Sequence, residues 1–394
     1  MILHPVDVVR DGNLAATGLR RAEQLCVVVA LISVLMLCAY PNWLIDVRGQ
    51  VAATDFVGEW AAGKLAVEGH PAAAYDWTVH KRAEINALGH EFDGDFPWCY
   101  PPPFLFVVAA LARLPYLAAF AVWMAVTWVA FGIVLRGIIG HRFGFLLAAA
   151  FPATMFNIAV GQNGFLTAAL IGGSLLLLDR RPMVAGLFLG MLTYKPHLGL
   201  VFPLALAVGG YWRTFATAAA VAMAFALASW AAFGSAAWAA FFQATATIAK
   251  VVLSDGAGLG RLQSTFGLVR TLGGGETTAW VFHIIVAFGS TAGVLIIWRR
   301  PVPFELKAAA LTVGTVLITP YVYISDLTIL ALPIAFLTRL GLRTNFWTGE
   351  PAALIAAAAC IFLFPEVGVV TGLLAMLVIA ALILRRVCID ERMP

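Results

Sequence analysis

Long apolar runs recur along the whole chain and predict a bundle of membrane-spanning helices. A helix that crosses the ~30 Å hydrocarbon core of a bilayer needs roughly 20 mostly apolar residues. The expected spans, about twelve with several of them short, are residues 25–44, 117–139, 143–160, 165–178, 183–194, 198–208, 215–233, 279–298, 306–319, 324–340, 352–364 and 367–384. We therefore expect one all-α, polytopic membrane domain over residues 1–394.

Two longer segments, residues 45–116 and 234–278, separate these runs and mix apolar with polar positions. In the first segment Phe56, Trp60 and Leu65 alternate with polar residues, which is typical of an amphipathic helix. Such helices lie in the membrane interface and can roof a cavity whose floor is the bundle. This arrangement suits a reaction between a lipid-borne group and an acceptor that arrives from outside.

Composition and charge agree with a membrane protein: 62% of the residues are hydrophobic and 12% are charged. Lys and Arg close to helix ends mark cytoplasmic loops. The arginines expected on one side are Arg20, Arg21, Arg136, Arg142, Arg180, Arg181, Arg213, Arg299, Arg300, Arg339, Arg343, Arg385 and Arg386. We expect a multi-pass protein of the plasma (inner) membrane with both termini cytoplasmic and both longer segments outside. The net charge of +4 comes from these cytoplasmic helix ends and not from a basic surface stripe, so nucleic-acid binding is not expected.

The first apolar run is expected to be an anchor and not a signal peptide, because it is long and lacks an A-x-A-like cleavage site. A lipoprotein site at Cys38 is disfavoured by the large Leu37 before it. The five cysteines are spread over both sides and the spans, so they predict neither a disulfide framework nor a thiolate metal site.

Asp55 and Glu59 form an acidic pair directly after the first span. They are four residues apart, so both carboxyl groups share one face of a helix. Two close carboxylates raise the pKa of one of them, which hinders a base that must be ionised at neutral pH. We therefore rank Asp55 above Glu59 as a candidate catalytic group.

Lys195 and His197 lie between two apolar runs that are each short for a membrane crossing. Pro196 cannot donate a backbone hydrogen bond and should end the first run, which gives a broken or re-entrant pair. An ammonium and an imidazole at such a break suit a phosphate. The alternative is that Lys195 reaches from a loop to the membrane interface.

Other polar positions each allow two interpretations. Gln162 and Asn163, between two glycines, form either a tight helical turn or a pair of amides for substrate hydroxyls. Tyr321 and Asp326 follow Pro320, where the acid either starts a helix or belongs to a site.

The second long segment holds Arg261, Gln263 and Ser264. Its arginine suits either a phosphate or lipid headgroups. In the first segment, Tyr100 either stacks on a sugar or lies in the interfacial aromatic belt. Asp93 and Asp95 could bind a metal ion, but we expect them to be solvated loop acids.

The order of these motifs resembles glycosyltransferase family 87, over about residues 55 to 326. It runs from a first span to a D-F segment, G-x-x-x-x-x-YD, Y-x-P-x-F, GQN, KPH, and then Q-S with a downstream Arg. The chain departs from the family at Leu262, where members often have Asn before Gln-Ser.

The resemblance implies a glycosyltransferase C-type membrane fold and transfer of a sugar, often mannose, from a polyprenyl monophosphate. The acceptor would be a hydroxyl of a glycolipid or glycan of the cell envelope, and the anomeric carbon would invert. The family's catalytic acid falls on Asp55 as general base. Lys195, His197 and Arg261 are expected to bind the donor phosphate. The expected substrate-binding residues are Glu59, Tyr100, Gln162, Asn163, Gln263, Ser264, Tyr321 and Asp326.

No cofactor or metal is expected, because cationic side chains can neutralise a phosphate leaving group. The partners would be the lipid-linked donor, the acceptor and membrane lipids. The competing class is a secondary transporter or flippase, since broken helices with a lysine at mid-depth also occur in carriers. Matching halves are not evident in the sequence, which disfavours a carrier. A third alternative, a non-catalytic scaffold, does not explain why a lysine would be buried at membrane depth.

Overall fold

The computed structural model describes residues 5–39, 43–254, 258–364 and 370–390, and over these residues the fold is all-helical. The β pairing among them is a single bridge between Ile45 and Val51. The bundle helices are α1 (Pro5–Ala39), α5 (Tyr116–Ile139), α6 (Phe143–Ala150), α7 (Pro152–Val160), α8 (Gly164–Leu177), α9 (Pro182–Met191), α10 (Phe202–Gly209), α11 (Trp212–Ala249), α13 (Glu276–Arg299), α14 (Phe304–Leu317), α15 (Ala331–Thr344), α16 (Glu350–Phe362) and α18 (Thr371–Asp390). The predicted all-α class is confirmed.

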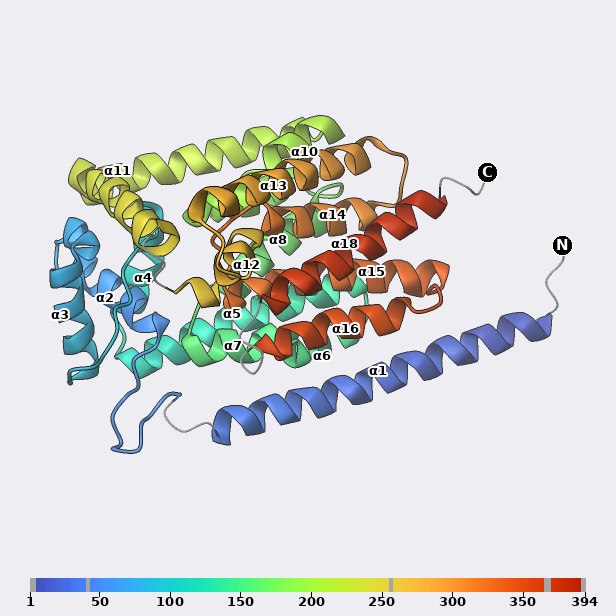
Figure 1. Ribbon diagram of the computed structural model, residues 1–394, viewed down its shortest axis with the longest axis horizontal. Helices are drawn as coiled ribbons and strands as arrows, with labels where there is room; N and C mark the ends of the chain where they lie inside the picture. Colours follow the sequence, from blue (N-terminus) through green and yellow to red (C-terminus); the bar gives the residue numbers. More distant parts are fainter. Residues whose placement is uncertain (1–4, 40–42, 255–257, 365–369, 391–394) are drawn as a thin grey trace.

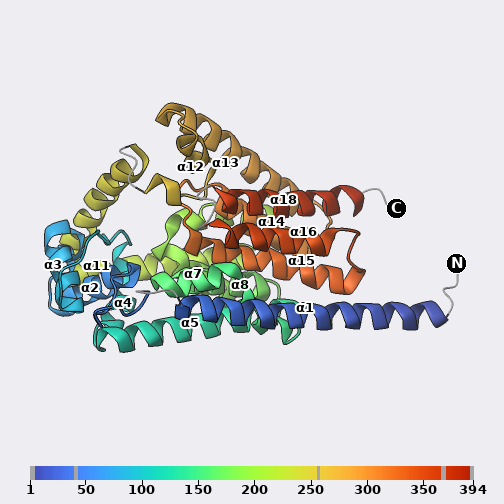
Figure 2. The same ribbon diagram turned by 60° about the horizontal axis from the view of Figure 1, so that its bottom comes forward.

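A second group of short helices covers one end of this bundle (Figures 1 and 2). It contains α2 (Asp55–Val67), η1 (Pro71–Tyr75), α3 (Trp77–Leu88), η2 (Pro102–Phe104) and α4 (Leu105–Leu111). The helix expected around Phe56 and Trp60 is therefore present. α1 begins and α18 ends at the opposite end of the bundle (Figure 1).

Among the residues that the structure describes, six helical segments are long and apolar enough to cross a membrane: Gly18–Ala39, Tyr116–Ile139, Trp212–Leu253, Glu276–Arg299, Ile324–Thr344 and Thr371–Cys388. The bent pair of α6 and α7 makes up to seven. Each of the twelve expected runs overlaps a helix, although residues 40–42 and 367–369 of two runs lie outside the described residues. The remaining runs fall on helices too short to meet the same criterion.

Three breaks in the bundle follow from single residues. α6 and α7 meet at an angle of 57° before Pro152, because a residue that precedes proline is disfavoured in the helical region. α11 is interrupted at Gly234, whose φ of +78° suits glycine. The expected break at Pro196 is confirmed, because η3 (Leu192–Tyr194) ends before Lys195 and η4 (Pro196–Gly199) begins after it.

Ion pairs join several of the expected cytoplasmic arginines to acids of neighbouring helices. Arg142 pairs with Glu23 of α1 at 3.0 Å, and Arg343 of α15 pairs with Glu305 of α14 at 2.6 Å. α15 ends at the end of the bundle where α1 begins (Figure 1).

Close backbone contact fixes α2 to the rest of the short-helix group. A Cβ at Gly63 would overlap the Val108 carbonyl oxygen of α4, and one at Gly58 would overlap the Phe96 carbonyl oxygen. Phe56 and Val57 are fully buried on the same helix, and each such side chain stabilises the fold by about 1.5–3 kcal/mol. These contacts set the position of the first turn of α2, which carries Asp55.

Candidate active site

Asp55 is the first residue of α2, where the helix dipole favours a negative charge. Its side chain is half-buried, so it does not point freely into bulk solvent. Glu59 follows one turn later and is 2% exposed. Both carboxyl groups belong to one hydrogen-bond network.

The corner between α7 and α8 supplies the amides of this network. Asn157 closes the corner, since its Nδ2 donates to the Gln162 carbonyl oxygen at 2.9 Å and its Oδ1 accepts from Gly164 N at 2.9 Å. A Cβ at Gly164 would overlap the carbonyl oxygen of Ser325, so only glycine lets the corner reach η7 (Ile324–Leu330). The corner is thus a tight turn, and it also presents two side-chain amides.

These amides bind both carboxyl groups of α2. Gln162 Nε2 donates to Asp55 Oδ2 at 2.9 Å, and Asn163 Nδ2 donates to Glu59 Oε1 at 3.1 Å. Tyr100 links the two amides, because its hydroxyl accepts from Asn163 Nδ2 at 2.7 Å and donates to Gln162 Oε1 at 3.1 Å. An ionised carboxylate only accepts, so this chain of donors fixes the orientation of Gln162.

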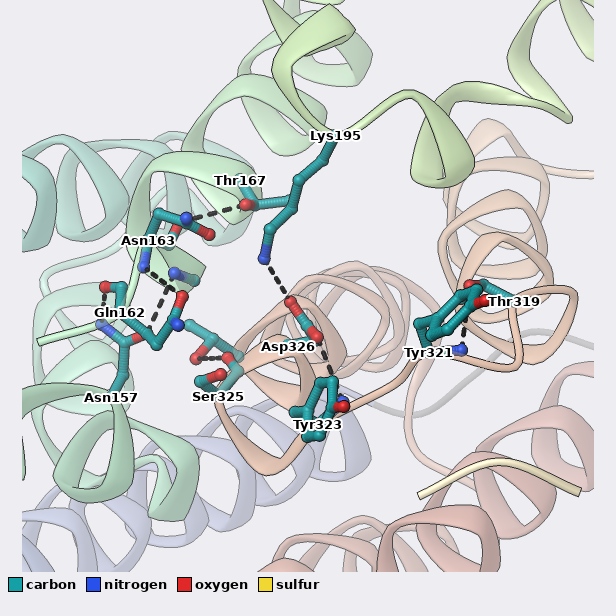
Figure 3. A network of polar contacts seen from close by, with 12 residues as sticks. Asn157, Gln162, Asn163, Thr167, Lys195, Thr319, Tyr321, Tyr323, Ser325 and Asp326 are labelled. Carbon is teal, nitrogen blue, oxygen red and sulfur yellow. Dashed lines mark hydrogen bonds and ion pairs between the residues drawn. The ribbon is translucent and has the colours of Figure 1, made fainter. Parts of the chain in front are cut away.

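Lys195 projects from the Pro196 break into the protein and not toward a membrane surface. Its Nζ lies 2.6 Å from Asp326 Oδ1, and both side chains are buried (Figure 3). The second carboxylate oxygen of Asp326 accepts from Tyr323 N at 3.1 Å. Asp326 therefore caps the start of η7 and also holds the lysine. His197 is half-buried and interacts electrostatically with both partners of the pair.

Arg261 is exposed on η6 (Leu259–Arg261), and no ion pair involves it among the described residues. Gln263 and Ser264, two expected substrate-binding residues, are buried and bonded within the protein. Gln263 Oε1 accepts from Gly372 N at 2.9 Å, and Ser264 Oγ donates to the Pro320 carbonyl oxygen at 2.8 Å. In this structure they hold the chain that carries Arg261.

The remaining expected groups are less involved in the network. Tyr321 is half-buried beside this loop, where its backbone N donates to Thr319 Oγ1 at 3.3 Å (Figure 3). Asp93 and Asp95 are exposed. Within the described ranges, no group of three or more His, Cys, Asp or Glu side chains is placed to hold a metal ion. The role of Asn157 in closing the corner between α7 and α8 was not predicted. The available signal was that this asparagine lies only six residues before Asn163 in the sequence.

Burial raises the pKa of Asp55 above its ordinary value. The hydrogen bond from Gln162 and the nearby charges of Arg261 and Lys195 oppose this effect. Burial also raises the pKa of Glu59 to about 8, with the Asp55 charge adding to the shift. At neutral pH Glu59 is therefore largely neutral, whereas Asp55 has three groups that favour its charged form.

We expect Gln162→Leu to lower the activity of the site most strongly at low pH. A hydrogen bond to the charged form lowers a pKa, so its removal raises the pKa of Asp55 and moves the acid limb of kcat/KM to higher pH. A pH–rate profile measures the shift, with exposed Gln243→Leu as the matched control. An unchanged acid limb would contradict the role of Gln162.

Glu59→Gln should remove a pH dependence of stability. The pKa of Glu59 is raised from 4.5 to about 8, so the folded state holds a proton that the unfolded state releases, and stability falls as the pH rises between these values. Apparent Tm in detergent should drop less between about pH 5 and 8.5 for Glu59→Gln than for the wild type. Glu68→Gln, on an exposed residue at the end of α2, should behave as the wild type. If apparent Tm fell equally with pH in Glu59→Gln and in the wild type, Glu59 would not be the group that holds this proton.

Fold and site together define a helical membrane protein with carboxylates, amides and cations clustered at one end. The family model described as Glycosyltransferase family 87 matches residues 98–320, more than half of the 394-residue chain. The chain belongs to glycosyltransferase family 87, as the order of motifs predicted. No curated protein and no solved structure matches it significantly. The matched stretch contains Gln162, Lys195 and Arg261, while Asp55 and Asp326 lie outside it.

Proposed function

We propose that the protein transfers a sugar from a polyprenyl monophosphate to a hydroxyl of a glycolipid or glycan, with Asp55 as general base. The reaction takes place at the outer face of the plasma (inner) membrane. One observation carries the proposal. The half-buried Asp55 carboxylate is oriented by Gln162 and lies near two cations, Lys195 and Arg261. Family membership supports the glycosyltransferase class over a carrier.

In this scheme Asp55 takes the proton of the acceptor hydroxyl. Oδ2 is held by Gln162, and Oδ1 receives no hydrogen bond from the described residues. The acceptor oxygen bonds to the anomeric carbon as the bond from that carbon to the phosphate oxygen breaks. A positioned base contributes about 10² to 10⁴ in rate. A single base fits inversion, unlike the nucleophile and acid pair of retaining glycosidases.

The leaving polyprenyl phosphate carries an additional negative charge as the bond breaks. Arg261 is exposed and can contact two phosphate oxygens with its planar guanidinium. Lys195 and His197 would approach from the Pro196 break, with Asp326 as the positioning residue that holds the ammonium. These side chains supply the positive charge, so the scheme includes no metal or cofactor.

The other expected substrate-binding residues divide into two roles. Glu59, Asn163 and Tyr100 would contact sugar hydroxyls, because their network adjoins Asp55. Gln263, Ser264 and Tyr321 would position the Arg261 loop without touching the substrate.

The membrane arrangement that this function needs is also part of the proposal. It comprises about twelve spans in the glycosyltransferase C-type fold, both termini in the cytoplasm and α2 to α4 at the outer interface. The lipid tail of the donor would enter between helices from the bilayer.

Purified protein incubated with radiolabelled polyprenyl-phosphate mannose, glucose and arabinose tests the proposal. Labelled product with an envelope glycolipid extract as acceptor is the expected result. Substrate-dependent uptake into vesicles without product would instead identify a carrier and overturn the proposal.

A further inference from the structure

A groove lies between the starts of α9 and α11, away from the candidate active site. Its volume is about 590 Å³, and its walls are residues 181–184 at the start of α9 and Arg213, Ala216 and Thr217 of α11. α9 and η3 lead from this groove to Lys195. The chain rises about 1.5–2 Å per residue along them, which places the groove about 20 Å from that lysine.

Close packing of α9 on α11 fixes the walls of the groove. A Cβ at Gly186 would overlap the Thr217 side chain, and one at Gly190 would overlap another side chain of α11. At the start of the two helices, Thr214 Oγ1 donates to the Pro182 carbonyl oxygen at 3.1 Å. The two helices are therefore held in one relative position from the groove to the middle of α9.

Two arginines give the groove a positive charge. Arg181 and Arg213 both line it and both are exposed. Among the described residues neither side chain forms an ion pair, and exposed Asp179 pairs with neither of them. A guanidinium binds two oxygens of a phosphate with its planar fork of donors. The groove is therefore suited to an anionic group, and a phosphate fits best.

Exposed apolar side chains continue from the groove along both helices. Those of α9 are spaced four residues apart, and they are Met183, Leu187 and Met191. On α11, Met223 and Leu227 follow Ala216 of the groove by seven and eleven residues, which puts them on the same helix face. Trp212 is exposed at the start of α11, a position typical of aromatic residues at the level of lipid headgroups. The charged groove thus adjoins an apolar wall.

We propose that this groove binds an anionic phospholipid of the bilayer. The phosphate lies between Arg181 and Arg213, and the acyl chains lie along the exposed apolar faces of α9 and α11. Basic pockets between membrane helices bind lipid headgroups in this way. Two cations without a counter-charge favour a lipid with a net negative charge over a zwitterionic one, whose amine would add a third positive charge. A soluble phosphate would pair with the arginines but has no chains to cover the apolar wall.

Native mass spectrometry of the delipidated full-length protein measures the affinity for the first bound lipid. The lipids are phosphatidylglycerol and phosphatidylcholine with the same acyl chains. The competitors are glycerophosphoglycerol, which is the anionic headgroup without chains, and polyprenyl phosphate.

Two groove variants and one control are compared with the wild type. Arg181→Gln with Arg213→Gln removes both cations, whereas Ala216→Trp fills the groove and keeps them. Arg20→Gln with Arg21→Gln removes two exposed arginines of α1 and is matched in charge. The comparison of the two lipids on the wild type needs no variant, so it holds even if a variant folds poorly.

The wild type should bind phosphatidylglycerol at least about tenfold more tightly than phosphatidylcholine, since each arginine near a lipid headgroup contributes about 1 kcal/mol. Both groove variants should lose this preference, and the α1 control should keep it. Glycerophosphoglycerol at the same concentration should displace no phosphatidylglycerol.

Equal affinity of the wild type for the two lipids overturns the inference, and so does unchanged binding of phosphatidylglycerol in either groove variant. Displacement by glycerophosphoglycerol would identify a site for free phosphate, and tighter binding of polyprenyl phosphate would identify a site for the donor lipid. Either result also overturns it. Lipid binding is measured without sugar transfer, so its outcome is independent of the proposed function.

Discussion

Asp55→Asn is expected to lower sugar transfer by at least about 10²-fold while the protein stays folded and inserted in the membrane. Asparagine has the shape of aspartate, and its amide oxygen can still accept the hydrogen bond that Gln162 donates to Asp55. It cannot take a proton from the acceptor hydroxyl, so the loss should appear in kcat. Transfer of labelled sugar per mole of folded protein is the measurement.

Glu68→Gln is the matched control for this variant. Glu68 lies at the other end of α2, its side chain is about half exposed, and it pairs with Lys64 at 3.4 Å. This variant should transfer sugar at the wild-type rate. Normal turnover by Asp55→Asn would remove Asp55 from the role of base.

The second large effect concerns the buried pair of Lys195 and Asp326. Lys195→Met leaves the Asp326 carboxylate buried without its cation, and such changes typically cost about 3–5 kcal/mol. The double variant Lys195→Met with Asp326→Leu removes both charges and should recover much of the stability. Transfer should stay absent in the double variant, because no ammonium is left for the donor phosphate. Thermal unfolding and transfer are measured on the same preparations.

Arg386 and Glu350 provide a comparable buried pair, joining α16 to α18 with Nη2 and Oε2 2.5 Å apart. The double variant Arg386→Met with Glu350→Leu should keep transfer per folded molecule, because this pair lies outside the candidate site. A Lys195 and Asp326 double variant that is stable and fully active would show that the pair serves the fold alone.

Several parts of the fold were predictable because their signals are local. The positions of the helices followed from apolar runs, and the Pro196 break followed from one residue that cannot donate a hydrogen bond. The spacing of four residues between Asp55 and Glu59 likewise fitted one face of a helix, and both lie on α2 in the structure. The number of crossings did not follow in the same way, because short helices such as α8 and α10 are apolar yet fall below the length of a full span.

The contacts within the site depend on distant segments and were less predictable. Lys195 was expected to meet a phosphate or a membrane surface, and the partner in the structure is Asp326, 131 residues away. Gln263 was expected to face substrate, but the amide is bonded to Gly372 N across 109 residues.

A cryo-electron microscopy structure of Asp55→Asn with bound polyprenyl-phosphate sugar tests the account most directly. It should place the donor phosphate within about 4 Å of Lys195 or Arg261, the usual range of an ion pair, with the anomeric carbon facing residue 55. A phosphate bound at the other end of the bundle, among the arginines of α15 and α18, would contradict the account.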